Sequence, residues 1–286
     1  MSAIDVSNPG KVLWPETGFT KAGLAAYYRG VSGAILPHLG DRPVTLRRFP
    51  DGIEGWGWYQ TNCRSAPDWL RTAEVRGRGG ATFRMCLIET AQALVWAANM
   101  AAIELHPLLA RTPELDCPTI VVFDLDPGPP ADVLDCCEIA LELRDRLGQL
   151  GLESFAKTTG SVGLHVYVPL NTPARYADTR AFARGLAESL DDPRVVTVQR
   201  RSARAGNVLV DWMQNDPMRS TVAPYSVRAV PWPTVSMPVA WTDVADTLAR
   251  RRPELLTFTT ETALERLERD GDLFRPVLEL EQRLPR

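Results

Sequence analysis

The sequence lacks any long hydrophobic run. No stretch of the 286 residues approaches the ~20 apolar residues that a membrane-spanning helix needs. The first residues, Met-Ser-Ala-Ile-Asp-Val, have neither the basic nor the apolar region of a signal peptide. Repeats and low-complexity segments are absent as well, and the 45% hydrophobic and 23% charged residues are ordinary for a globular protein. We therefore expect a cytoplasmic protein that does not associate with membranes.

Cysteine and excess basic charge are also scarce. The five cysteines are an odd number without a Cys-x-x-Cys pair, which argues against a zinc site or a framework of disulfides, so we expect buried free thiols. The formal net charge of −3 excludes no function class, but it provides no basic excess. A nucleic-acid-binding protein of this composition would have to concentrate its arginines on one surface.

Expected helices and strands alternate along the chain without strict β-α-β spacing. Helices are expected where apolar residues recur at helical spacing, and strands where β-branched residues cluster between turn residues. The expected helices are 20–29, 88–105, 132–150, 179–190 and 241–250, and the expected strands are 43–49, 120–125, 154–157, 164–168 and 207–212. This pattern predicts an α+β (mixed α/β) protein with a mixed central sheet.

One expected strand ends in two carboxylates, in the stretch Ile120-Val-Val-Phe-Asp-Leu-Asp-Pro-Gly-Pro-Pro130. Side chains i and i+2 of a strand share a face, so Asp124 and Asp126 would point the same way with Cα atoms roughly 6.6 Å apart. Two such charges repel unless a cation lies between them or one is protonated. A β-turn beginning at Asp126 is the alternative, but an unpaired Asp124 inside Val-Val-Phe-Asp-Leu would be costly.

A third carboxylate, Asp211, ends the expected strand Asn207-Val-Leu-Val-Asp-Trp212. Alone, it could equally be a cap at the end of a strand. Together with the first pair it becomes a candidate metal ligand, because three carboxylates from neighbouring strands suit one or two hard cations, Mg²⁺ or Mn²⁺. Two such ions are a common arrangement for in-line phosphoryl or nucleotidyl transfer.

Two further stretches allow a functional and a structural interpretation. The small residues of Lys157-Thr-Thr-Gly-Ser-Val-Gly-Leu-His165 would expose backbone N–H groups between two strands, as phosphate sites require. His165, directly after this turn, is either a phosphate donor or a structural histidine. The aromatic residues of Trp56-Gly-Trp-Tyr-Gln60 are either core residues or a surface on which a nucleobase stacks.

Several motifs occur in an order that resembles a known family. They are Asn8-Pro-Gly-Lys-Val-Leu-Trp-Pro-Glu-Thr-Gly-Phe-Thr-Lys21, Phe123-Asp-Leu-Asp-Pro-Gly-Pro, Gly163-Leu-His-Val, Val210-Asp-Trp, Val222-Ala-Pro-Tyr-Ser-Val-Arg228 and Val235-Ser-Met-Pro-Val239. The sequence resembles the polymerase domain of bacterial ligase D, the end-joining branch of the archaeo-eukaryotic primase superfamily. The resemblance covers nearly the whole chain, and since no ligase or nuclease module accompanies it, we expect a stand-alone member.

The resemblance implies a fold and an activity. The fold would be that of a primase-polymerase, a single domain over 1–286 whose central mixed or antiparallel sheet carries the acidic site between flanking helices. An N-terminal αβ module at 1–115 would hold the phosphate-binding and aromatic elements, followed by a catalytic core at 116–240 and a helical tail at 241–286. The activity would be that of a metal-dependent nucleotidyltransferase. It would add nucleotides, preferably ribonucleotides, to primer ends at DNA gaps or breaks during repair.

The resemblance also implies residue roles. Asp124, Asp126 and Asp211 would hold two Mn²⁺ or Mg²⁺ ions as the catalytic carboxylates. The residues for the incoming NTP or dNTP would be Arg48, Trp58 and Tyr59 at the base and its pocket, His106 at the sugar, Ser220 at the 2′-OH, and Thr159, Ser161, Gly163, His165 and Arg228 at the triphosphate. Lys11 and Lys21 would hold the 5′-phosphate of gapped or broken DNA. A DNA ligase and Ku are the protein partners that the family suggests.

The sequence departs from the family pattern around the triphosphate. Val162 stands where the family's turn usually has a lysine, and Gln214 stands where an arginine is common after the third aspartate. Thr61-Asn62 replaces the usual basic pair after the aromatics. These departures weaken the expected triphosphate contacts and leave the expected metal ligands unchanged.

Two other classes of function are compatible with parts of the sequence. A haloacid-dehalogenase-type phosphatase also places Asp-x-Asp after an apolar strand, but here Pro127-Gly128 follows in mid-chain, and Asp211 lacks the acidic partner that such enzymes have. A non-catalytic module that binds DNA ends would use Lys11 and Lys21, but it would have no need of three aspartates.

Overall fold

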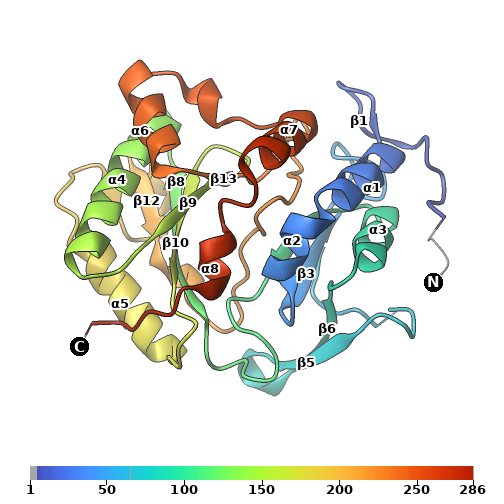
Figure 1. Cartoon of the computed structure of the whole chain (residues 1–286), viewed down its shortest axis with the longest axis horizontal. Coiled ribbons are helices and arrows are strands. Elements are labelled where there is room, and N and C mark those ends of the chain that lie inside the picture. The colour runs from blue at the N-terminus through green and yellow to red at the C-terminus, as the bar shows by residue number, and fades with distance from the viewer. Residues whose placement is uncertain (1–4, 65, 286) are drawn as a thin grey trace. The chain divides into compact units, whose positions relative to one another are not determined.

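The chain folds into two compact units in the computed structural model, which describes residues 5–64 and 66–285 (Figure 1). Unit 1 contains Met1–Pro113, Ser220–Ser236 and Phe258–Gly271, and unit 2 contains Glu114–Arg219, Met237–Thr257 and Asp272–Arg286. Residues 1–4 and 286 lie outside the described part of the chain. They belong to the expected domain over 1–286, and residues 1–4 also belong to the N-terminal segment in which no signal peptide is expected.

The expected segments 116–240 and 241–286 do not follow the two units. The chain leaves unit 2 and returns to unit 1 at residues 220–236, where Thr221 N–H donates to Pro107 O and Ala223 N–H donates to Leu105 O. Backbone pairing with an earlier strand therefore decides this boundary, and such pairing between distant segments leaves no mark in local composition.

Unit 1 is built on an antiparallel sheet. Its strands follow the order β4 (Trp58–Gln60), β3 (Pro43–Arg48), β6 (Thr82–Leu87) and β5 (Thr72–Arg76), and β7 (Ala102–Pro107) also pairs with β3. Its helices are α1 (Lys21–Gly30), α2 (Ser32–Leu39), α3 (Ala91–Asn99) and α7 (Thr260–Asp270), and β1 (Val12–Trp14) with β2 (Phe19–Thr20) forms a separate hairpin. The start of α1 is as expected, since the Thr20 side chain caps it by accepting from Gly23 N–H.

The expected helix over 88–105 is confirmed only in its first part, and its end is wrong. Helix α3 ends at Asn99, Ala101 has φ +52°, and the chain continues as strand β7. All six residues of β7 are buried, so the strand shows no alternation of polar and apolar residues. A fully buried strand and a buried helix give the same continuous apolar run, and here pairing with β3 decides for the strand.

The expectation of free thiols throughout is also wrong. Cys63 and Cys86 form a disulfide in unit 1, with Cα atoms 5.7 Å apart, whereas Cys117, Cys136 and Cys137 are free. Cys86 lies in β6, and Cys63 N–H donates to Arg84 O of the same strand, so pairing along the sheet brings the two residues together. Their separation of 23 residues in sequence gave no indication of this.

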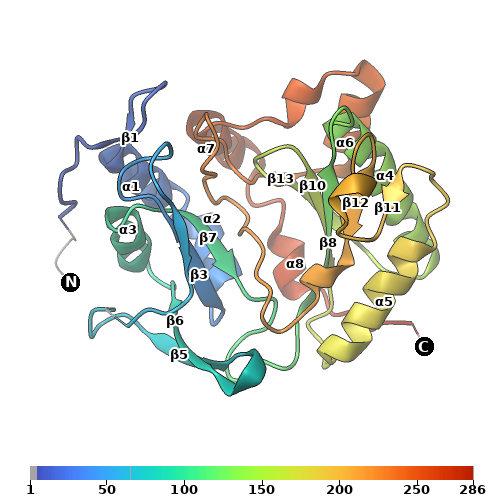
Figure 2. The same cartoon turned by 180° about the vertical axis from the view of Figure 1, so that it is seen from behind.

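Unit 2 contains the mixed sheet that the sequence predicts. Its order is β11 (Val195–Val196), β12 (Val208–Asp211), β8 (Ile120–Pro127), β10 (Leu164–Pro169), β9 (Phe155–Thr158) and β13 (Pro238–Val239), and only the β11–β12 pair is parallel. Helices α4 (Val133–Gln149), α5 (Tyr176–Glu188) and α8 (Arg275–Glu279) pack against this sheet, and α6 (Trp241–Arg250) packs against α4. Figure 2 shows β12, β8 and β10 from the side of α5.

The core of unit 2 explains why β8 and β10 are strands. Phe123 pairs with Val166, and Leu125 pairs with Leu164, so these four apolar side chains share one face and are fully buried. Gly163, just before β10, is required by a close approach, because a Cβ at this position would collide with the carbonyl oxygen of Leu125. The polar residues that alternate with these apolar residues in β8 and β10 therefore lie on the opposite face of the two strands.

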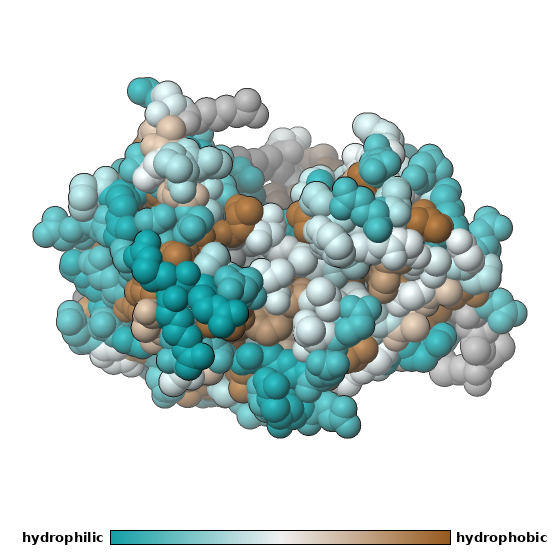
Figure 3. Space-filling model, turned by 90° about the horizontal axis from the view of Figure 1, so that it is seen from above, coloured by the Kyte–Doolittle hydropathy of each residue, from teal (hydrophilic) through white to brown (hydrophobic). Residues whose placement is uncertain are grey.

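The surface carries mostly hydrophilic side chains on the face drawn in Figure 3, with hydrophobic residues scattered between them. Trp56 is the most exposed of the large hydrophobic residues that the structure describes, at 77%. None of the helices in the described part of the chain is long and apolar enough to cross a membrane.

Candidate active site

Four polar side chains lie on one face of the unit 2 sheet. In register, Asp124 of β8 is directly opposite Asp211 of β12 on one side and His165 of β10 on the other. Directly paired residues in antiparallel strands point to the same face, so these three form a row across the sheet. Asp126 lies two residues further along β8 and shares that face, as the sequence predicts.

Each carboxylate of the row has polar partners. His165 Nε2 lies 3.2 Å from Asp124 Oδ1. Gln214 Nε2 donates to Asp211 Oδ2 at 3.0 Å and lies 3.5 Å from Asp124 Oδ2, so this side chain connects two of the aspartates. Arg204 Nη1 donates to Asp126 Oδ2 at 2.8 Å. A positive charge therefore already faces one end of the acidic group.

Sequence reasoning missed Arg204 and also Gln199, whose Nε2 donates to Asp211 Oδ2 at 2.8 Å. Both residues lie in the segment that leads into β12. The only signal was the basic stretch 200–204 close before a strand that ends in a carboxylate. Gln214 was noticed as a departure from the family pattern, and the structure gives it a contact to the third aspartate.

The electrostatics of the row disfavour its full ionisation. Burial raises the pKa of Asp211, and the charge of Asp124 raises it further. Burial and Asp124 likewise raise the pKa of Asp126, although Arg204 opposes this shift. Both shifts have the direction that buried like charges produce, and a bound cation would reverse it.

The donor set fits a hard divalent cation by its chemistry, because all the candidate ligands are carboxylate oxygens. The side chains of Asp124 and Asp126 are 24% and 43% exposed, so an ion can reach them from solvent. The described residues nevertheless contain no group of three His, Cys, Asp or Glu side chains that already converges on one point. Metal binding would therefore require Asp126 or Asp211 to turn from its present partner.

The turn before His165 differs from the expected cradle of exposed amides. Thr159 Oγ1 accepts from Ser161 N–H at 3.2 Å and from Gly163 N–H at 3.1 Å, and Thr159 N–H donates to Gly163 O. A threonine hydroxyl competes well for nearby amides, so this turn satisfies its own donors. A phosphate at this position would have to displace the Thr159 hydroxyl.

In unit 1, two of the residues expected at the nucleotide, His106 and Arg228, lie together with Arg47 against a carboxylate that the sequence did not single out. Glu104 of β7 is fully buried. Arg47 Nη1 donates to its Oε1 at 2.7 Å, Arg228 Nε lies 3.3 Å from the same oxygen, and His106 Nε2 lies 2.7 Å from Oε2. The strand pattern places Glu104 and His106 on one face, but the apolar run around them had suggested a helix.

The aromatic residues of β4 contact this group. The Tyr59 ring meets the His106 ring edge to face at 5.5 Å, and the Arg47 guanidinium lies 5.3 Å from the Tyr59 ring centre. Tyr59 is 58% exposed, so its ring keeps a surface on which a base could stack. Trp58 instead stacks on Trp56 at 5.0 Å.

Two other expected nucleotide residues of unit 1 have partners of their own. Arg48 donates to Gln60 Oε1 at 2.7 Å and to Met100 O at 2.8 Å, and its guanidinium lies 5.0 Å from the Trp58 ring. Ser220 forms an isolated backbone bridge to Leu108, two residues beyond His106. Arg48 and Ser220 therefore have positions that are fixed by contacts within the unit.

Lys11 and Lys21 lie close enough to influence each other. Burial lowers the pKa of Lys21, and the charge of Lys11 lowers it further. Lys21 Nζ donates to Ser7 Oγ at 3.2 Å and to Asn99 Oδ1 at 3.3 Å, and Lys11 Nζ donates to Asp51 Oδ1 at 3.0 Å. The sequence indicated neither Asn99 nor Asp51, since both are distant along the chain.

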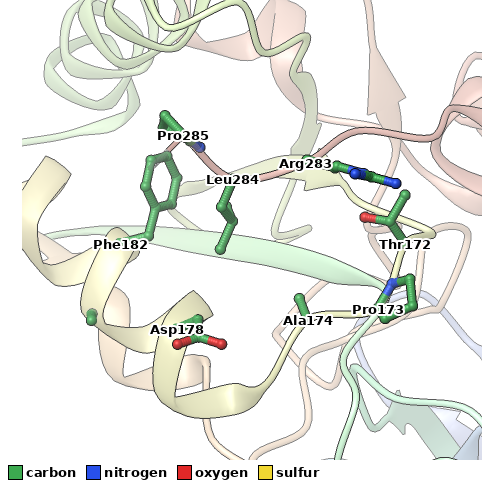
Figure 4. A pocket seen from close by; sticks show the side chains of 9 residues that line it. Thr172, Pro173, Ala174, Asp178, Phe182, Arg283, Leu284 and Pro285 are labelled. Carbon is green, nitrogen blue, oxygen red and sulfur yellow. The ribbon is translucent and has the colours of Figure 1, made fainter.

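Unit 2 also contains a groove that other residues line. Figure 4 shows it between α5, which provides Asp178 and Phe182, and the C-terminal residues Leu284 and Pro285. None of the residues that the sequence assigns to the site lines this groove. The candidate site is therefore the polar face of the sheet and not this groove.

Comparison with known proteins identifies the class. Residues 20–274 match the family described as LigD, primase-polymerase domain. The multifunctional non-homologous end joining protein LigD of Mycolicibacterium smegmatis is 38% identical over 280 residues, which cover 96% of this chain and 36% of the relative. The bifunctional non-homologous end joining protein LigD of Bacillus subtilis is 30% identical over 266 residues, covering 91% of this chain and 42% of the relative.

A solved structure supports the same conclusion. The polymerase domain from Mycobacterium tuberculosis ligase D in complex with DNA is similar with a TM-score of 0.90 and 35% identity, over 99% of this chain and all of that domain. The chain belongs to the LigD primase-polymerase domain family, as its motifs indicated. It spans about a third of the length of the mycobacterial relatives that it matches.

Proposed function

We propose that this chain is a DNA-directed nucleotidyltransferase that extends primer ends at gaps or breaks during end joining. The observation that carries the proposal is the row of Asp211, Asp124 and His165 across three strands, with Asp126 on the same face. In a family of primase-polymerase domains, such carboxylates at the end of apolar strands are the natural ligands of catalytic cations. The raised pKa values of Asp126 and Asp211 support this role, because these carboxylates gain from a cation.

Asp124, Asp126 and Asp211 would hold the cations. Bound Mn²⁺ or Mg²⁺ would supply positive charge to the attacking and leaving oxygens of an in-line displacement. His165 Nε2, now beside Asp124, would be able to donate to a phosphate oxygen of the nucleotide if that contact opens. Gln214 is neutral where relatives often have an arginine, so it would orient Asp211 without adding charge to the triphosphate site.

The residues of unit 1 would select the nucleotide. Tyr59, Trp58 and Arg48 would contact the base and its pocket, and Arg228 the triphosphate. Ser220 and His106 would contact the sugar, so we expect ribonucleotides to be preferred. A site built to hydrogen-bond a hydroxyl discriminates strongly against a substrate that lacks it, because its own polar groups are left unpaired.

Lys11 and Lys21 would bind the 5′-phosphate on the far side of a gap. The ammonium groups of Lys11 and Lys21 are close enough for the charge of Lys11 to lower the pKa of Lys21, so together they form a suitable site for a dianion. The solved relative in complex with DNA supports DNA as the substrate. The family resemblance of the sequence suggests a DNA ligase and Ku as partners of the reaction, and we include both in the proposal.

The decisive experiment compares extension of a gapped duplex, with and without a 5′-phosphate, with initiation on a bare single strand. Each reaction contains Mn²⁺ and either a ribonucleotide or a deoxyribonucleotide triphosphate. We expect extension of the phosphorylated gap with a higher kcat/KM for the ribonucleotide. Binding of the gap without any extension would indicate the non-catalytic DNA-end-binding module instead. Equal kcat/KM for the two sugars would contradict the proposed sugar contacts.

A further inference from the structure

Glu104 is a buried carboxylate to which the proposed reaction gives no role. Besides the contacts of Arg47, Arg228 and His106, its Oε1 accepts from Ala229 N–H at 3.0 Å. One side chain thus holds two segments of unit 1, the β3–β7 part of the sheet and the segment around Arg228. Removal of the carboxylate would release Arg228 and His106 together, and these are two of the residues expected to contact the incoming nucleotide.

The surroundings of Glu104 decide the protonation of its neighbour. Burial alone would raise the pKa of Glu104, but the hydrogen bond from His106 and the charges of Arg228 and Arg47 outweigh it, so the pKa is lowered and the carboxylate is ionised. Burial lowers the pKa of His106, the hydrogen bond and the charge of Glu104 oppose this shift, and Arg228 and Arg47 add to it, so the net shift is downward and favours the neutral imidazole at neutral pH. A neutral imidazole carries one proton, and the ionised carboxylate at 2.7 Å from Nε2 requires a donor. The proton is therefore on Nε2, and Nδ1 is an acceptor.

We propose that Glu104 is a positioning residue that fixes the Nε2–H tautomer of His106 and thereby makes Nδ1 an acceptor for a sugar hydroxyl of the incoming nucleotide. This inference rests on the proposed function. An acceptor nitrogen selects for a hydroxyl, because a deoxy position has no proton to donate. The other tautomer would present a donor, which a hydroxyl can also satisfy, but the carboxylate would then lose its partner. Glu104 therefore provides orientation and polarity without touching the nucleotide.

The tautomer can be measured without any assay of activity. The chain has three histidines, His38, His106 and His165, so the ¹⁵N shifts of their imidazoles can be assigned with one His106→Gln spectrum. We expect His106 to show a protonated Nε2 and an unprotonated Nδ1 at neutral pH in the wild type. A proton on Nδ1, or a doubly protonated ring, would overturn the proposal. Because the tautomer is read from the wild type, the result holds even if the Glu104 variants fail to fold.

Kinetics test the consequence for the sugar. In Glu104→Gln a neutral amide replaces the carboxylate, so neither the tautomer nor the orientation of His106 is fixed, and the ratio of kcat/KM for ribonucleotide over deoxyribonucleotide should fall about tenfold, the effect of one hydrogen bond. Glu104→Asp keeps the charge and should retain more of the ratio than Glu104→Gln. Glu89→Gln is the matched control, because it removes the partner of Arg71 at the same 2.7 Å in the same unit and should leave the ratio unchanged.

The outcomes separate this inference from the proposed function. An unchanged ratio in a folded Glu104→Gln variant would overturn the inference while the wild type still extends primers. Absence of extension by the wild type would overturn the proposed function, and the ¹⁵N spectrum would still decide the tautomer. A ratio that falls equally in Glu89→Gln would show a general loss of order in unit 1 and would also count against the specific role of Glu104.

Discussion

Glu104 in unit 1 and Asp211 in unit 2 are both buried carboxylates, and their pKa values move in opposite directions. The partners explain the difference. Glu104 faces two guanidinium groups and a histidine, whereas Asp211 faces Asp124 and two amide donors, and the charge of Arg219 only partly offsets the rise in its pKa. Burial opposes ionisation in both places, but only unit 1 supplies enough positive charge to overcome it.

The comparison distinguishes Glu104, whose charge is balanced by other groups of the protein, from the aspartates, whose mutual repulsion a bound cation would relieve. Glu104 has hydrogen-bond donors for both oxygens and holds other side chains in place, so its chemistry is orientation. The aspartates repel one another, although the guanidinium of Arg204 offsets part of this at Asp126. A site of the second kind stores unfavourable electrostatic energy that a cation releases on binding.

The strongest test of this comparison replaces the aspartates. Asp124→Ala or Asp126→Ala should reduce nucleotide addition below detection under Mn²⁺, because a lost ligand removes the charge that the reaction needs. The metal-free variants should unfold no more easily than the wild type, since removing one carboxylate relieves repulsion. Extension of a gapped duplex and thermal unfolding measure the two effects. Asp145→Ala, an exposed aspartate of α4, is the control, and near-normal extension by Asp124→Ala would refute the assignment.

The pH dependence of stability should differ in sign between the two regions. The folded pKa of Glu104 lies below its ordinary value of 4.5, so its stabilisation is present above that pH and is lost as the pH falls. Glu104→Gln should therefore lose about 3 kcal/mol of unfolding free energy at neutral pH, as expected when one partner of a buried ion pair is removed. The loss should shrink below about pH 4.5.

The aspartates should behave in the opposite way. The folded pKa values of Asp126 and Asp211 lie above the ordinary 3.8, so the metal-free protein loses stability as the pH rises through those values. Asp124→Asn relieves this repulsion and should stabilise the metal-free protein, by about 1 kcal/mol or less, only above that range. Urea unfolding at several pH values measures both variants. If the change in unfolding free energy depended on pH in the same way for Glu104→Gln and Asp124→Asn, the proposed difference between the two regions would be contradicted.

A smaller effect concerns the lysine pair. Replacing Lys11 and Lys21 together by Ala should weaken binding to a 5′-phosphorylated gap about tenfold, the size of a charge-assisted hydrogen bond. Binding to the unphosphorylated gap should change much less, and the difference should shrink as salt rises. Fluorescence anisotropy on both gaps at two salt concentrations measures this. Arg29→Ala, which removes another cation of α1, should retain the preference, and a double lysine variant that also retains it would place the phosphate site elsewhere.

The smallest expected effect comes from the carboxylate beside Lys11. Asp51 is 82% exposed in its side chain and competes with an incoming phosphate for the Lys11 ammonium at 3.0 Å. Asp51→Asn should therefore strengthen binding to the phosphorylated gap about two- to threefold at low salt, as expected for an exposed ion pair. Titration by anisotropy against the wild type is the measurement, and a weaker binding by Asp51→Asn would mean that Asp51 orients Lys11 instead of competing for it.

The sequence by itself determined the acidic face of the sheet. Alternation along β8 was enough to predict that Asp124 and Asp126 share a side, because the period of a strand is fixed by the backbone. The apolar runs before Asp124 and Asp211 predicted two strands, and Thr20 and Asp132 marked helix starts that the structure confirms. The order of the motifs was sufficient to identify the family. All of these features are local and leave a mark within a few residues.

Only the tertiary structure decided which distant residues meet. The register of three strands placed Asp211 and His165 opposite Asp124, and it brought Arg204 and Gln199 to the carboxylates. Pairing with β3 turned an apolar run that reads as a helix into strand β7, which is why Glu104 was missed. Its partners Arg47 and Arg228 are separated from it by 57 and 124 residues along the chain. Hydrogen bonds and charges between such segments depend on backbone pairing, and a single sequence carries no local signal of that pairing.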